Sequence, residues 1–102
     1  MSVSTLSSSL QLHLVPAGRR LDFAHAPGCY AYVYRRNHYR PWECIARNAS
    51  SPYLDRTPLP VGAPTEYVVL YQDVAGTVVA ASLIVQATPA QLPAAPALLG
   101  LR

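Results

Sequence analysis

The feature that most constrains this chain is the segment of residues 29–36, in which two kinds of side chain alternate over residues 29–34. The small or aliphatic set is Cys29, Ala31 and Val33, and the tyrosine set is Tyr30, Tyr32 and Tyr34. Successive side chains of a β-strand point to opposite faces, and aromatic and β-branched residues favour strands. The segment therefore predicts a strand with Val33 in a core and its tyrosines on the outer face.

A basic and aromatic loop follows this strand, and residues 42–47 are expected to return beside it as the second strand of a hairpin. If the chain turns near residues 37–40, Cys44 lies opposite about Val33, and Cys29 is more than one residue pair away from Cys44. A disulfide requires Cα atoms within about 7 Å of each other. We therefore expect two free thiols, whereas a shifted register would permit a bridge.

Segments with a strand-like pattern continue through most of the chain and are separated by turns that contain Gly, Pro or Ser. The predicted strands are residues 10–15, 20–26, 29–36, 42–47, 52–56, 65–72 and 77–88. Seven short strands at regular spacing, without a helical period, indicate an all-β sandwich or barrel, and we expect the former, a seven-stranded antiparallel β-sandwich. We expect residues 1–9 to be a flexible N-terminal arm, residues 10–88 the sandwich, and residues 89–102 a C-terminal tail rich in Pro, Ala and Leu.

The composition indicates more apolar surface than a small soluble monomer usually carries. Of the 102 residues, 51% are hydrophobic and 13% are charged, whereas charged residues usually make up about 25%. The N-terminus lacks the basic and apolar parts of a signal peptide, and no apolar run approaches the ~20 residues of a membrane-spanning helix. We expect synthesis in the cytoplasm, or export by a route that needs no such signal, and no membrane contact, with a place in a virion or another assembled particle as one option.

Five segments follow one another in a pattern that ends in a tyrosine-containing strand after a loop rich in Gly and Pro. They are residues 32–36, 42–46, 51–55, 58–62 and 66–71. This run resembles the C, C′, E and F strands of fibronectin type III-like domains, which have an immunoglobulin-like β-sandwich fold, and the resemblance covers about residues 10–88. It implies that Tyr67 is the tyrosine of the corner between strands E and F, with its hydroxyl bonded back to the loop backbone. Such domains usually carry a core tryptophan in the second strand, where this chain has Phe23.

The same alignment defines an outward face of the sheet that carries the tyrosines. In this alignment the side chains of Tyr67 and Val69 point into the core, and those of Val68 and Leu70 point outward. Soluble monomers avoid large apolar patches, and Tyr, Trp and Arg are enriched in the hot spots of protein interfaces. The expected interface residues are Tyr30, Tyr32, Tyr34, Arg35, Arg36, Tyr39, Arg40, Trp42, Val68 and Leu70.

These observations predict a non-enzymatic structural or interaction subunit. It would form a homo-oligomer, or decorate a larger protein assembly such as a filament, a shell or a virion part, through this face and its terminal arms. If the C-terminal tail folds over the face instead, the patch is hidden within one chain.

Residues 35–42 suggest an alternative, because arginines contact phosphates and the rings of Tyr39 and Trp42 offer stacking surfaces for single-stranded nucleic acid. The segment is short, and the formal net charge of the chain is only +3, so nucleic acid ranks behind a protein partner. A carbohydrate-binding or adhesion module that uses the same aromatic residues is a third alternative.

No pattern in the chain indicates catalysis. Its five acidic residues are spread out, and it contains neither a nucleophile elbow nor a phosphate-binding loop. The residues His13, His25, His38, Cys29 and Cys44 lack the close paired spacing of a structural zinc site. We expect no enzymatic activity, no metal site and no cofactor.

Overall fold

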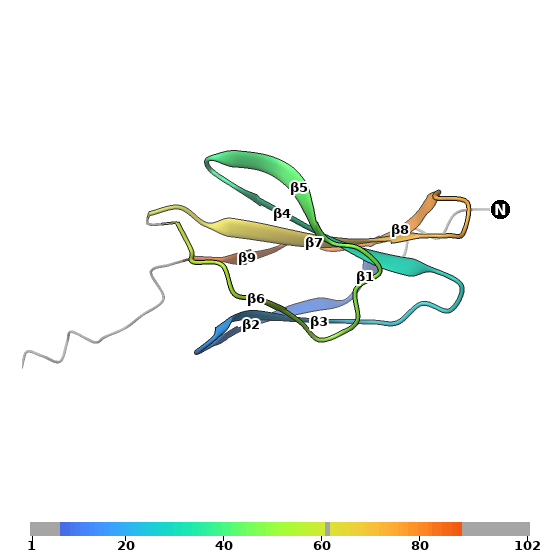
Figure 1. The fold of residues 1–102 in the computed structure, drawn as a ribbon, viewed down its shortest axis with the longest axis horizontal. Helices are drawn as coiled ribbons and strands as arrows, with labels where there is room; N and C mark the ends of the chain where they lie inside the picture. The colour runs from blue at the N-terminus through green and yellow to red at the C-terminus, as the bar shows by residue number, and fades with distance from the viewer. Residues whose placement is uncertain (1–6, 61, 89–102) are drawn as a thin grey trace, which may run out of the picture.

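The structure, a computed structural model, describes residues 7–60 and 62–88, and the strands of these residues form two layers (Figure 1). The strands are β1 Ser7–Ser8, β2 Leu10–Val15, β3 Gly18–Phe23, β4 Tyr30–Asn37, β5 Arg40–Ala46, β6 Tyr53–Asp55, β7 Thr65–Gln72, β8 Val78–Ser82 and β9 Val85–Ala87. The described residues contain no helix. The expectation of an all-β protein is confirmed.

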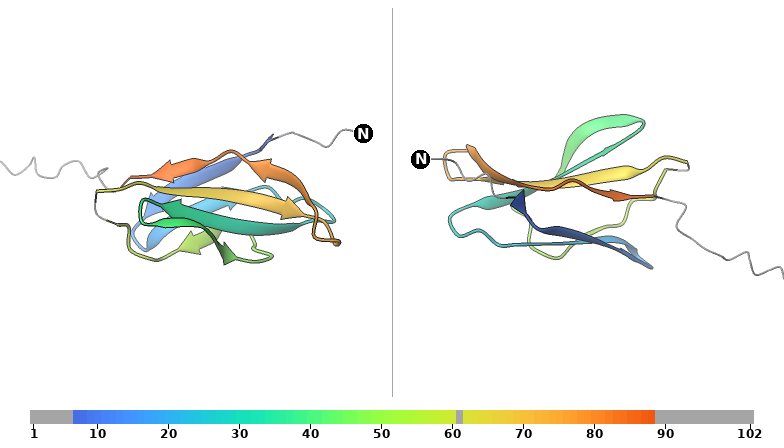
Figure 2. Two further views of the ribbon diagram at one scale, coloured as in Figure 1. Left: turned by 90° about the horizontal axis from the view of Figure 1, so that it is seen from above. Right: turned by 180° about the vertical axis from the view of Figure 1, so that it is seen from behind.

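The two layers are a three-stranded and a six-stranded sheet that face each other (Figures 1 and 2). The smaller sheet has the order β2-β3-β6, and the larger has the order β1-β8-β7-β4-β5, with β9 also paired to β7. The pairing of β1 with β8 is parallel, and the other pairings among the described strands are antiparallel. Two layers of antiparallel strands enclose one core, as in a sandwich.

The hairpin expected at the centre of the chain is present as β4 and β5. A register irregularity in this pair places Val33 opposite Ala46 and Tyr34 opposite Cys44. The prediction that Cys44 lies opposite about Val33 is wrong by one residue, because the register also shifts by one residue nearer the turn, between the pairs Asn37–Arg40 and Arg35–Glu43. Both cysteines are free thiols, as expected.

The last predicted strand, residues 77–88, is divided into β8 and β9, which pair with opposite ends of β7. The Ser82 hydroxyl accepts a hydrogen bond from the backbone N–H of Val69 at 2.9 Å and donates one to the carbonyl of Leu83 at 2.8 Å. Because a side chain satisfies this backbone donor, Leu83 and Ile84 leave the ladder and are exposed. This break, together with β1, makes nine described strands rather than seven.

The other observed strands differ from the predicted ones mainly in the residues at which they begin and end. The strands β2 and β7 have the predicted limits, whereas β3 starts at Gly18 and ends at Phe23 instead of spanning 20–26. This shift brings Arg19 into a strand, where it is buried. Of the expected arms, residues 1–6 and 89–102 lie outside the described residues, and Ser7–Ser8 pair with β8.

The core lies between the sheets and follows the alternation of β4 and β7. Its buried cluster consists of Leu10, Leu21, Ala31, Val33, Tyr67, Val69, Tyr71 and Ala87, and the partly buried residues packed against it include Leu12, Phe23, Ile45 and Tyr53. Every second residue of β7, from Thr65 to Tyr71, is buried. Val33, Tyr67 and Val69 are completely buried, and Phe23 keeps partial exposure at the edge of this core.

Candidate functional site

The outer face of the six-stranded sheet carries the tyrosine row, and the left view of Figure 2 looks onto this sheet. Residues directly opposite each other in an antiparallel pair lie on the same face. The cross-strand pairs on the outer face of β4 and β7 are Tyr30 with Gln72, Tyr32 with Leu70, Tyr34 with Val68, and Arg36 with Glu66. Tyr30 is exposed, and the other members are half-buried. The two central pairs are each an aromatic ring beside an aliphatic side chain.

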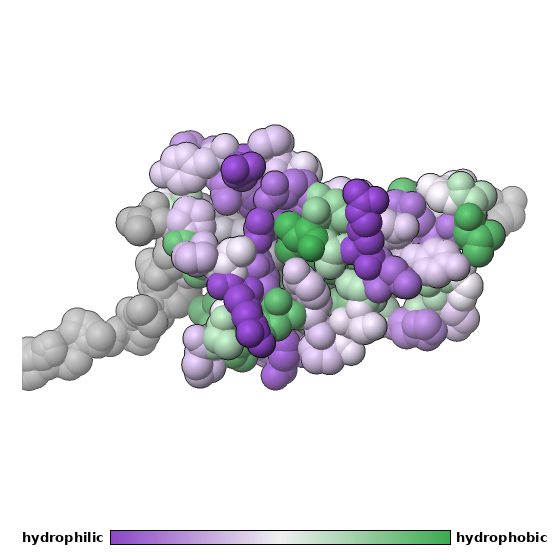
Figure 3. Space-filling model, viewed as in Figure 1, coloured by the Kyte–Doolittle hydropathy of each residue, from purple (hydrophilic) through white to green (hydrophobic). Residues whose placement is uncertain are grey.

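The neighbouring strands extend this face on both sides. Cys44 of β5 lies opposite Tyr34, and Ala81 of β8 lies opposite Leu70. Figures 1 and 2 show the β4–β5 hairpin curving away from the three-stranded sheet, so that β5 borders the outer face. By contrast, the side of the molecule seen in Figure 3 shows hydrophobic residues as small separate areas among hydrophilic ones.

At one end of the tyrosine row, Arg36 links three strands. Its guanidinium pairs with the Glu66 carboxylate at 2.6 Å and lies over the Trp42 ring, 4.4 Å from the ring centroid. A cation over an indole face is attracted by the ring quadrupole. Trp42 is therefore already covered by a side chain of its own protein. Glu66, which sequence analysis did not include among the interface residues, could have been found from its alternation with Val68 and Leu70.

Two of the expected site residues, Tyr39 and Arg40, lie at the tip of the hairpin. The Asn37 side-chain oxygen accepts hydrogen bonds from the backbone N–H groups of Tyr39 and Arg40 at 2.8 and 3.0 Å, which fixes the turn. Tyr39 is 68% exposed, and Arg40 reaches Glu43 only at 3.7 Å. The structure thus separates these two residues from the tyrosine row.

Arg35 points in the opposite direction to Arg36, because neighbouring residues of a strand face opposite sides. Its guanidinium donates hydrogen bonds to Asp55 at 3.0 and 3.2 Å, to Thr57 at 2.9 Å and to Glu43 at 2.8 Å. Arg35 was expected at the interface with Arg36, and it lies instead in a polar cluster on the inner side of the sheet. The basic and aromatic residues of this hairpin therefore do not form one surface.

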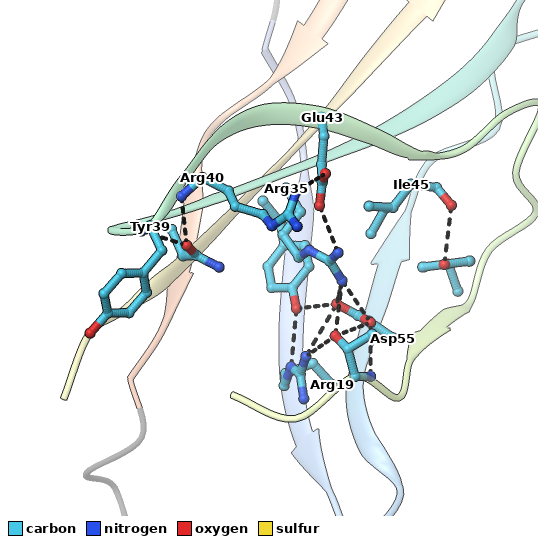
Figure 4. Close-up of polar contacts among 11 residues, drawn as sticks. Arg19, Arg35, Tyr39, Arg40, Glu43, Ile45 and Asp55 are labelled. Carbon is cyan, nitrogen blue, oxygen red and sulfur yellow. Dashed lines mark hydrogen bonds and ion pairs between the residues drawn. The ribbon is translucent and has the colours of Figure 1, made fainter. Parts of the chain in front are cut away.

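This inner cluster centres on Asp55 and joins the two sheets (Figure 4). The Tyr67 hydroxyl donates to the Asp55 carboxylate at 2.6 Å and accepts from Arg19 at 3.0 Å, and Arg19 also donates to Asp55 at 3.2 Å. The side chains of Arg19 and Asp55 are 5% and 3% exposed. Tyr67 is thus buried as the resemblance implies, but the hydroxyl bond described here goes to a carboxylate rather than to a loop backbone. Contacts among Arg19, Asp55 and Tyr67 thus connect β3 and β6 of the smaller sheet with β7 of the larger one.

The surroundings of the cluster shift the pKa values of its acidic groups. Burial alone would raise the pKa of the Asp55 carboxyl, but its hydrogen bonds from Tyr67, Thr57 and Arg35 outweigh burial and hold the pKa below the ordinary value. The hydrogen bond from Arg35 lowers the pKa of Glu43. Burial, together with the bond to Asp55, raises the pKa of the Tyr67 hydroxyl above its ordinary value.

These shifts predict that stability decreases at both ends of the pH scale. A lowered carboxyl pKa stabilises the fold above the unfolded value of about 4, and this stability is lost as pH falls below that value. A raised tyrosine pKa stabilises the fold below the unfolded value of about 10, and this stability is lost as pH rises further. Urea unfolding at stepped pH should show a plateau between these limits, a shallower acid decline in Asp55→Asn and a shallower alkaline decline in Tyr67→Phe. Unchanged slopes in both variants would contradict the assignment.

A cavity of about 310 Å³ lies at another part of the sandwich, between the turns around residues 24–29 and 48–51. Its lining residues are Phe23, Ala24, His25, Ala26, Cys29, Ala31, Asn48, Ala49, Ser50, Ser51 and Tyr71. The volume is at the lower limit for a small-molecule site. The lining contains no acidic residue, Lys or Arg, so it offers no carboxylate pair for acid–base chemistry.

Within residues 7–60 and 62–88, no three His, Cys, Asp or Glu side chains are grouped so that they could hold a metal ion. The same residues include no helix long and apolar enough to cross a membrane. Comparisons of the chain with protein-family models, with curated proteins and with solved structures found no match.

Proposed function

We propose that this chain is a non-enzymatic interaction subunit with a fibronectin type III-like fold that self-associates through the outer face of its six-stranded sheet. The strand order supports the fold assignment. In the immunoglobulin-type sandwich, strands A, B and E share one sheet, and C, F and G share the other, with C′ added beside C in some members. Here β2, β3 and β6 share the smaller sheet, while β7, β4 and β5 are consecutive in the larger one, with β8 and β9 on the far side of β7.

The observation that carries the functional proposal is the row of paired tyrosines and aliphatic residues on β4 and β7. The inner faces of these strands pack in the core, and the described residues form no third layer over their outer faces. Between Gln72 at one end and Glu66 at the other, this face bears no charged side chain on either strand. Rigid aromatic side chains on an apolar, partly exposed surface are typical of the centres of protein interfaces.

Single-stranded nucleic acid is less well supported as a partner. Arg35 is held by two carboxylates, and Arg36 pairs with Glu66 and covers Trp42. Of the residues expected to bind a strand, Tyr39 and Arg40 are the exposed ones at the hairpin tip. One cation and one ring make a weak site, because such binding depends on several phosphate contacts and successive stacked bases. The same cover over Trp42 weakens the carbohydrate-binding alternative.

Tyr32→Glu tests the proposed face. The substitution places a carboxylate in the middle of the apolar row, and burying an unpaired charge is costly. We expect sedimentation equilibrium to show self-association of the natural protein and an affinity at least about 100-fold lower for Tyr32→Glu, with the far-ultraviolet circular dichroism spectrum of the folded protein retained. Tyr39→Glu, at the exposed hairpin tip, is the matched control and should associate normally. A natural protein that stays monomeric at high concentration, or a Tyr32→Glu variant that associates normally, would refute the proposal.

A further inference from the structure

The pairing of residues across β4 and β7 determines how two copies can pack through this face, if the chain self-associates there as proposed above. Packed sheets usually keep their strand directions within about 30° of each other. A twofold axis lying in the interface can therefore run nearly parallel to the strands or nearly across them. The two choices bring different side chains into contact.

The geometry points to a face-to-face dimer whose twofold axis runs parallel to β4 and β7 and midway between them. Rotation about this axis places β4 of one copy over β7 of the other. Each residue keeps its position along the strand direction. Tyr32 of one copy then lies over Leu70 of the other, and Tyr34 lies over Val68, because these residues are cross-strand partners. A large ring faces a smaller aliphatic side chain at both levels, which allows the two layers to interdigitate.

The charged pair at the end of the row is self-complementary under the same rotation. Arg36 and Glu66 are also cross-strand partners, so Arg36 of each copy lies over Glu66 of the other. Their side chains are 41% and 27% exposed and already pair within one chain. A guanidinium has five N–H donors, so it can contact a second carboxylate. Two arginines and two glutamates then alternate around a four-membered ring of charges at the edge of the interface.

Two other arrangements lack this complementarity. An axis across the strands stacks β4 on β4, so that tyrosines meet tyrosines and Arg36 approaches the Tyr30 end of the other copy. Edge-to-edge pairing of the larger sheet would use one of its outermost strands, β5 or β1. β5 contains Pro41 and a register irregularity, and β1 has only two residues. These features hinder the addition of a further strand.

Charge reversal distinguishes these arrangements. In a parallel-axis dimer of Arg36→Glu, all four charges of the ring are negative, and in a dimer of Glu66→Arg all four are positive. Each variant alone should self-associate at least about tenfold more weakly at low salt, because like charges face each other. An equimolar mixture of the two variants should form a one-to-one heterodimer in native mass spectrometry, since every contact between the copies is then attractive. The double variant R36E/E66R should regain self-association.

The controls separate this inference from the proposed function. Arg56→Glu makes the same charge change at an exposed site that follows β6 of the smaller sheet, and should associate normally. A cooperative thermal unfolding transition in each variant would show that the variants are folded. If the natural protein associates and Tyr32→Glu abolishes association, but the mixed variants form no heterodimer, the parallel twofold axis is wrong while the proposed function stands. A monomeric natural protein overturns both.

Discussion

Replacement of Asp55 by Asn is expected to lower the free energy of unfolding by about 3–5 kcal/mol. Asn has nearly the same shape, so the loss comes from the charge rather than from packing. Asp55 neutralises Arg19, whose side chain is 5% exposed, and it also pairs with Arg35. Removing one partner of a buried ion pair leaves the other charge desolvated without compensation. Urea unfolding monitored by far-ultraviolet circular dichroism measures the loss.

The chain contains a matched control for this prediction. Asp22 accepts a hydrogen bond from Arg20 at 3.2 Å, the same distance as between Asp55 and Arg19, but both of its partners are partly exposed. Asp22→Asn should lower the free energy of unfolding by only about 0–1 kcal/mol, since exposed ion pairs contribute little. Equal losses in the two variants would mean that burial does not determine the strength of the Asp55 cluster.

Gly18→Ala is expected to have an effect of similar size through the backbone. Gly18 has a φ of 149°, and a Cβ placed on it would lie 2.2 Å from the carbonyl oxygen of Asp55 and 3.0 Å from the Cα of Arg56. Steric overlap and a strained backbone angle each cost about 1–3 kcal/mol, so we expect a total loss of about 2–6 kcal/mol. Because both obstructing atoms belong to the backbone, β3 must move away from β6 to relieve the overlap.

A second glycine provides the comparison for Gly18. Gly76 has a φ of 87°, but a Cβ placed on it would have no atom within 4 Å. Gly76→Ala should therefore show only the cost of its backbone angle, about 1–2 kcal/mol. Thermal unfolding of both variants isolates the cost of the overlap. A Gly18→Ala variant no less stable than Gly76→Ala would show that β3 and β6 do not need their close approach.

The alternation within β4 and β7 could be predicted because it is a property of the local backbone. Ala31 and Val33 face the core and the tyrosines face outward, as the two-residue period requires. The division of residues 77–88 into two strands could not be predicted in this way. It depends on the Ser82 hydroxyl reaching the N–H of Val69, which requires the two strands to be in place first.

The residues of the candidate site likewise divide into those predictable from local alternation and those that depend on contacts between strands. The tyrosine row could be read from one segment, and its neighbours Val68 and Leu70 from another, once both were assigned to the same sheet. The separate directions of Arg35 and Arg36 follow from the same alternation, but which carboxylates they meet does not. Asp55 belongs to a strand of three residues in the opposite sheet, so no spacing in the sequence connects it with Arg19 or Tyr67.

The sequence by itself determined the class of the protein and the two faces of its central strands, because local side-chain period and turn residues suffice to specify these. Only the tertiary structure decided which charges are buried together and which remain on the outer face. The position of Asp55 between Arg19, Arg35 and Tyr67 arises where two sheets meet. The pairing of Arg36 with Glu66 arises from the register of β4 against β7. Both are contacts between residues distant in the chain, and their free energy exists only after the sheets have formed.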